Sequence, residues 1–185
     1  MDPAREILIL MGASGVTVFC LDGEVPTLEE LFGRVRGDGI ELSLDLHPDA
    51  YPIDPRRRDW EHALVRYRPD RLPIPVGCAS FPSRPGSGAA AGAFEEVGWM
   101  SGRVRSLPHS HGRGAILQCL RETQMVVTAG MPYPPVGADA EAAIWSIANF
   151  FVQEREGLTH VAGVGFYEGD DLILDTRTLR EKRTR

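Results

Sequence analysis

Residues 40–47 alternate strictly between apolar and polar side chains, and no other stretch constrains the fold as strongly. The apolar positions are Ile40, Leu42, Leu44 and Leu46, and a polar or charged residue follows each of them. Successive side chains of a β-strand point to opposite faces of its sheet, so this pattern predicts a strand with one buried face. Other elements of the chain must therefore cover that face.

A helix is predicted shortly before this strand. Thr27 and Glu30 have the spacing of a capping box, in which hydroxyl and carboxylate bind free N–H groups of the first helical turn. The apolar residues that follow are spaced i, i+3, i+4 and i+7, and they are Leu28, Leu31, Phe32 and Val35. This spacing predicts one buried face on a helix that ends at Gly37.

A longer helix is predicted in the second half of the chain. We expect Asp139 to cap it and Gly157 to end it. Its apolar stripe at helical spacing consists of Ile144, Ile147, Ala148, Phe151 and Val152. Trp145 lies beside this stripe, so we expect it to be buried. Shorter helices are predicted over 94–100 and near 116–122.

The other apolar runs predict strands. Residues 7–11 and 16–21 flank the turn sequence 12–15, which is typical of a β-hairpin. Further strands are expected over 63–67 and 125–129. Residues 160–167 and 172–174 are expected to form a hairpin across the turn 168–171.

These elements predict the fold class. Each half of the chain contains strand, helix, strand and strand in that order. We therefore predict an α+β fold, with a mainly antiparallel sheet and helices packed on one side. The repeated order also suggests a hypothesis, a degenerate duplication of a strand-helix-strand-strand unit.

The 185 residues fit one domain, for which we predict two lobes. Residues 1–81 form an acidic lobe with 9 basic and 14 acidic side chains, and residues 94–175 form the second lobe. Residues 82–93 are small and lack periodicity, so a flexible loop is expected there. Residues 176–185 form a basic tail with five positive side chains: Arg177, Arg180, Lys182, Arg183 and Arg185.

The composition of the chain limits the compartment in which the protein is expected and the classes of partner that it can bind. The chain has three cysteines without a C-x-x-C pair, and its N-terminal sequence does not fit a signal peptide. We therefore expect a cytoplasmic protein with reduced thiols and no membrane contact. Of the 20 basic residues 19 are arginine, a bacterial-type composition that is typical of a genome rich in G and C. The net charge of −6 argues against nucleic-acid binding except through the tail.

Few motifs indicate catalysis. The spacing of Gly12 and Gly15 matches neither a phosphate-binding loop nor a dinucleotide loop. His109 and His111 are the best metal pair, because side chains two residues apart point the same way from an extended segment. Zinc would need further ligands. We therefore name no catalytic residue and expect no cofactor.

Four residues are the candidates for binding a partner. Trp99 and Tyr133 are aromatic side chains that can anchor an interface, and Tyr133 lies in the P-x-x-P segment 131–135. Asp45 and Asp49 belong to the acidic half. With His47 between them they are also the positions of a carboxylate-imidazole-carboxylate array, although Pro48 argues against a continuous strand there.

Two functional hypotheses follow. The first is a small cytosolic, non-enzymatic protein-binding module of the immunity, adaptor or regulatory-subunit type, which presents an acidic surface to a basic protein partner. The alternative is a metal-dependent hydrolase with His109 and His111 at the site. Metal analysis of the native protein separates the two hypotheses.

Overall fold

The computed structural model describes residues 15–37, 42–45, 62–67, 73–80, 88–107, 112–130 and 138–176. In these residues the strands are β1 (Gly15–Cys20), β2 (Leu42–Asp45), β3 (His62–Tyr67), β4 (Pro73–Ser80), β5 (Met125–Gly130), β6 (Gly157–Val161), β7 (Gly165–Glu168) and β8 (Asp171–Asp175). The helices are α2 (Leu28–Gly37), α3 (Gly88–Ser106), α4 (Arg113–Glu122) and α5 (Ala138–Arg155).

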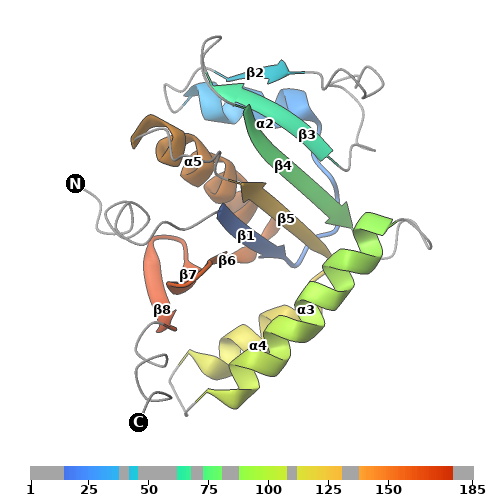
Figure 1. Ribbon diagram of the computed structural model, residues 1–185, viewed down its shortest axis with the longest axis vertical. Coiled ribbons are helices and arrows are strands. Elements are labelled where there is room, and N and C mark those ends of the chain that lie inside the picture. Colours follow the sequence, from blue (N-terminus) through green and yellow to red (C-terminus); the bar gives the residue numbers. More distant parts are fainter. Residues whose placement is uncertain are drawn as a thin grey trace.

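The strands form one antiparallel sheet, which confirms the predicted α+β class (Figure 1). Their order is β2-β3-β4-β5-β1-β6-β7-β8, so strands from both halves of the chain alternate in the middle of the sheet. The boundary predicted at 82–93 therefore does not separate two sheets. β5 and β6 occupy both edges of β1, so the prediction that 16–21 is the second strand of a hairpin was wrong.

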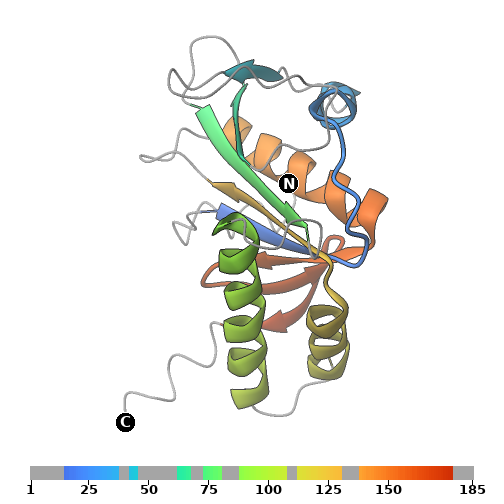
Figure 2. The same cartoon turned by 90° about the vertical axis from the view of Figure 1, so that its right-hand side faces the viewer.

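Helices cover both faces of the sheet, not one face as predicted (Figure 2). Val18 points to the face that α2 and α5 cover, whereas the next residue, Phe19, points to the face that α3 and α4 cover. The sequence of β1 explains this difference. Adjacent residues of the strand are apolar, and a strand can bury adjacent side chains only when both of its faces are covered.

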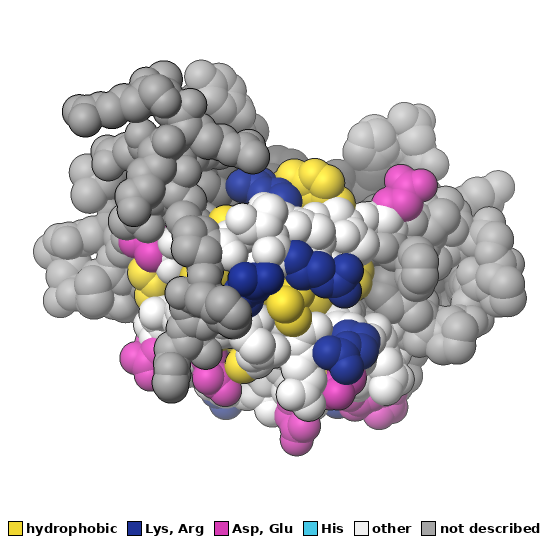
Figure 3. Space-filling model, turned by 90° about the horizontal axis from the view of Figure 1, so that it is seen from below, with side chains coloured by type: hydrophobic (Ala, Val, Ile, Leu, Met, Phe, Trp, Pro, Cys, Tyr) yellow, Lys and Arg dark blue, Asp and Glu magenta, His cyan; other side chains and the backbone are white. Residues whose placement is uncertain are grey.

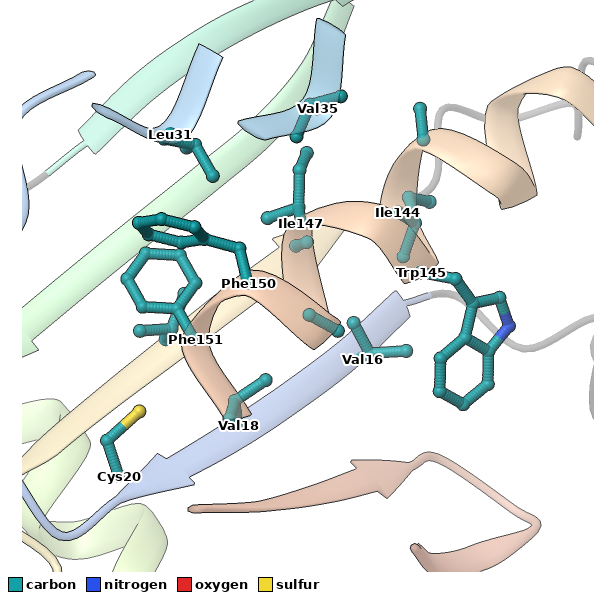
Figure 4. Close-up of a cluster of buried hydrophobic side chains, with 14 of the residues drawn as sticks. Val16, Val18, Cys20, Leu31, Val35, Ile144, Trp145, Ile147, Phe150 and Phe151 are labelled. Atoms are coloured by element: carbon teal, nitrogen blue, oxygen red, sulfur yellow. The ribbon is translucent and has the colours of Figure 1, made fainter. Parts of the chain in front are cut away.

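The larger core lies between the sheet and the helices α2 and α5 (Figure 4). Phe150 and Phe151 of α5 lie edge to face, with ring centroids 5.1 Å apart. Trp145 is buried as predicted, and its ring meets that of Tyr167 at 5.6 Å. Edge-to-face contact is a favourable arrangement of aromatic rings.

The ends of two helices show how local chemistry sets their bounds. The capping box at α2 is confirmed: Thr27 N donates to Glu30 Oε2 at 2.7 Å, and Glu30 N donates to Thr27 Oγ1 at 3.1 Å. In α5, Asp139 lies inside the first turn instead of before it. The helix ends at Arg155, and Glu156 adopts a φ of 46°, so the predicted stop at Gly157 falls instead at the start of β6.

α3 begins at Gly88 and is much longer than the helix predicted over 94–100. It takes in half of the segment that was predicted to be a flexible loop over 82–93. Four of the residues 88–93 are alanine, the residue with the highest helix propensity, which explains the difference.

The C-terminal strands also differ from the prediction. Residues 160–167 do not form one strand, because the chain turns at 162–164 between β6 and β7. The hairpin between β7 and β8 across the acidic turn is confirmed. None of the helices in the described part of the chain is both long and apolar enough to cross a membrane.

Candidate functional site

The structure describes two of the four predicted binding residues. Trp99 lies on α3, and Asp45 is the last residue of β2, an edge strand separated from β1 by three other strands. Tyr133 and Asp49 lie outside the described residues. Trp99 and Asp45 therefore belong to separate elements at different places in the fold.

The predicted metal pair, His109 and His111, also lies outside the described residues, as do the basic side chains of the tail. Among the residues that the structure does describe, no group of three or more His, Cys, Asp or Glu side chains is arranged to hold a metal ion. The metal hypothesis therefore stays a prediction from the sequence.

One end of the sheet carries an acidic surface. At this end β1 and β7 finish while β5, β6 and β8 begin, because neighbouring strands are antiparallel. We call it the acidic end, and its exposed carboxylates are Asp22, Glu24, Glu122, Glu154, Glu156, Glu168, Asp170 and Asp171. Two arginines, Arg121 and Arg155, lie among them. The acidic end thus combines both halves of the chain.

Backbone contacts hold the segments of the acidic end together. Leu21 N donates to Glu156 O at 2.8 Å, which joins the end of β1 to the start of β6. Gln124 N donates to Cys20 O at 2.9 Å and brings the end of α4 to the same place. Asp22 forms an ion pair with Arg155 at 3.7 Å. The carboxylates of the acidic end therefore lie on segments that backbone hydrogen bonds join to one another.

Cys119 of α4 lies beside the acidic end, and two carboxylates of that end affect the pKa of its thiol. Burial raises the pKa of the thiol from 9.0 to about 11, and the carboxylates of Glu122 and Glu168 contribute to the same shift. The thiol also donates a hydrogen bond to Phe19 O at 3.8 Å. Cys119 is therefore a protonated, structural cysteine at neutral pH.

Trp99 is the most exposed large hydrophobic side chain in the described residues, at 56%. The guanidinium of Arg103, one turn later on α3, lies over its ring at 4.8 Å from the centroid. Figure 3 shows the end of the molecule at which α3 and α4 lie, with basic side chains gathered around hydrophobic ones and acidic side chains along the lower margin. The basic side chains thus gather near the centre of this face, and most of the acidic ones lie toward its edge.

A polar row crosses the sheet beneath α3. Thr17 stands directly opposite Thr128 on one side and His160 on the other. The Thr17 hydroxyl donates to Glu96 Oε1 of α3 at 3.4 Å. The pKa of His160 is lowered from 6.5 to about 4, mainly by burial and to a smaller extent by the positive charge of Arg103. His160 is therefore neutral near pH 7, with limited exposure to solvent.

The acidic end was not predicted, because its members are scattered between positions 22 and 171 and meet only through the strand order. A partial signal was present: acidic residues follow or precede the predicted strands at 16–21 and 125–129, and they form the turn at 168–171. Comparison of the chain with models of protein families, with curated proteins and with solved structures finds no match in any of the three.

Proposed function

We propose that the protein is a small, non-enzymatic protein-binding module that presents the acidic end to a basic protein partner. Immunity proteins, adaptors and regulatory subunits are the kinds of protein that work in this way. The observation that carries the proposal is the convergence of eight exposed carboxylates, from segments far apart in sequence, at one end of the sheet. We place the module in the cytoplasm, where Cys20 and Cys119, which form no disulfide in the structure, would stay reduced.

The arrangement favours recognition by charge. Among the described residues, two arginines, Arg121 and Arg155, lie between the eight carboxylates, and Arg155 is paired with Asp22. A surface with this excess of one sign accelerates encounter with an oppositely charged protein and disfavours acidic competitors. The backbone hydrogen bonds at Leu21 and Gln124 limit the ordering cost of binding, because the segments are already held in place.

Affinity capture from an extract of cells that make the protein tests the proposal, followed by reconstitution of the complex from purified components. The probe is the wild-type chain beside a double variant, Glu154→Gln with Glu168→Gln, which neutralises two exposed carboxylates of the acidic end. We expect the captured protein to be basic, and its association rate to fall about tenfold with the variant and with added salt.

A matched double variant, Glu29→Gln with Glu95→Gln, removes two exposed carboxylates outside the acidic end. It should change the association rate less than Glu154→Gln with Glu168→Gln does, because neither side chain belongs to the acidic end. A purified partner that is acidic, or one that binds the wild type and the Glu154→Gln/Glu168→Gln variant equally well, would refute the proposal.

A further inference from the structure

Trp99 lies on the opposite side of α3 from the core. The helix buries Met100 and Val104 against the sheet, while Trp99 remains more than half exposed. Burial of a large aromatic side chain stabilises a fold, so the exposure of Trp99 forgoes that contribution. Tryptophan and arginine are also the residues most enriched at the energetic centres of protein interfaces.

The surface of α3 beside Trp99 has two exposed positions without a side chain. Gly98 and Gly102 are exposed, and a Cβ at either position would meet nothing within 4 Å. An incoming chain can therefore approach the backbone of α3 beside the indole ring. Arg103 stacks on that ring at 4.8 Å, and no described carboxylate forms an ion pair with it. We define the α3 surface as Gly98, Trp99, Gly102 and Arg103.

The charge around the α3 surface has the opposite sign to the rest of the chain. Residues 97–121 contain four arginines and no acidic residue, within a protein of net charge −6. The other residues carry 16 basic and 26 acidic side chains. Arg105 is exposed close to Arg103, and Arg113 lies nearby, because it donates to the backbone carbonyl of Arg105 at 2.6 Å.

We propose that the α3 surface binds an acidic protein segment that places an apolar side chain against Trp99 and a carboxylate against Arg103. Charge complementarity selects this occupant, since Arg103 and Arg105 are exposed on the C-terminal side of the indole ring, where residues 97–121 include no acidic residue. The carboxylates of Glu95 and Glu96 lie one turn before Trp99, so the carboxylate of the incoming segment is expected at the Arg103 side. The proposal goes beyond the acidic end, because it gives the molecule a second surface with the opposite charge preference.

A nucleic acid fits the surface less well than an acidic peptide. Arg113 is committed to the carbonyls of Leu107 and Arg105, at 2.9 and 2.6 Å, so it is not available for a phosphate chain. Arg121 lies at the acidic end beside Glu122. The remaining charges are too few for the several phosphate contacts on which nucleic-acid affinity depends.

Titration of the full chain with a synthetic peptide, several glutamates around one leucine, tests the proposal by calorimetry and tryptophan fluorescence. We expect saturable binding that weakens with salt and changes the emission of Trp99. Trp99→Ala and Arg103→Gln should each weaken it about tenfold, which is the effect typical of a central interface residue. Arg34→Gln is the matched control, because Arg34 is exposed on α2 and bonds to Gln153 on the other side of the sheet.

Four outcomes would overturn the proposal. They are no binding of the glutamate peptide to the wild type, equal binding by Trp99→Ala, equal binding of a peptide with glutamine in place of glutamate, and displacement of the peptide by a single-stranded oligonucleotide. A dimer that Trp99→Ala dissolves would assign the surface to a second copy instead. Because Glu154→Gln/Glu168→Gln should leave peptide binding intact, failure here is distinguishable from failure at the acidic end.

Discussion

The ring of His160 packs against the ring of Phe166, with centroids 4.8 Å apart and an angle of 45° between the planes. His160 thereby packs against the smaller core beneath α3, although histidine is fully buried less often than apolar residues are. Its position between an aromatic ring and the positive charge of Arg103 favours the neutral imidazole.

This environment predicts a loss of stability in acid. The pKa of His160 is about 4 in the folded chain against 6.5 ordinarily, so the unfolded state binds a proton more readily between these values. The free energy of unfolding should be unaffected above pH 6.5 and fall as the pH drops toward 4, by up to about 3 kcal/mol. Urea denaturation across this range measures the effect.

His160→Gln is the reference for this measurement, because glutamine does not titrate and the carboxylates of the chain titrate in both proteins. The wild type should lose more stability than the variant between pH 6.5 and 4. Parallel pH profiles for the two proteins would show that His160 is not buried in a neutral form.

A second prediction concerns the start of α2. Thr27→Ala removes the hydroxyl that accepts from Glu30 N, and should lower the free energy of unfolding by about 1 kcal/mol. Glu30→Gln should cost much less, since a glutamine amide oxygen can still accept from Thr27 N. Urea denaturation of both variants checks the ranking, and a smaller loss for Thr27→Ala than for Glu30→Gln would contradict it.

The contrast between α2 and β1 explains what the sequence could predict. Thr27 and Glu30 are three residues apart, so their mutual contact is local and readable from spacing alone. Val18 and Phe19 are adjacent, yet their separate cores depend on helices that lie far along the chain. The run 16–21 lacks strict alternation, which fits a strand with two covered faces, but it does not show which elements cover them.

The same distinction applies to the candidate surfaces. Trp99 was named as a candidate binding residue from its residue type alone, whereas its exposure depends on how α3 packs against the sheet. The acidic end required the strand order: Glu122 and Glu168 both act on Cys119 only because α4 lies over β1 and β6. Such an arrangement of distant residues has no local signal in one sequence.

A third prediction compares two glycines. Gly98→Ala should raise the free energy of unfolding by about 0.5–1 kcal/mol, since alanine is the better helix former and its Cβ would enter open space. Gly165→Ala should be strongly destabilising, because a Cβ there would clash with the carbonyl oxygen of Leu174 on the neighbouring strand. Thermal unfolding of the two variants gives the sign of each effect, and a destabilising Gly98→Ala would contradict the open space above α3.

The last prediction is low reactivity of Cys119. A thiol with a pKa of about 11 forms roughly a hundredfold less thiolate near neutral pH than one with a pKa of 9.0, and the thiolate is the reacting species. Alkylation by iodoacetamide, followed by peptide mass spectrometry, should therefore be about a hundredfold slower in the native protein than in urea.

Glu122→Gln with Glu168→Gln provides the electrostatic control for Cys119. Burial is the largest cause of its raised pKa and the two carboxylates are smaller causes, so the double variant should accelerate alkylation only modestly. Cys20, fully buried in the larger core, should be slower still in the same experiment. Equal rates for Cys119 in the native and urea-unfolded chain would exclude the packing of α4 against β1 described here, because that packing is what withholds water from the thiol.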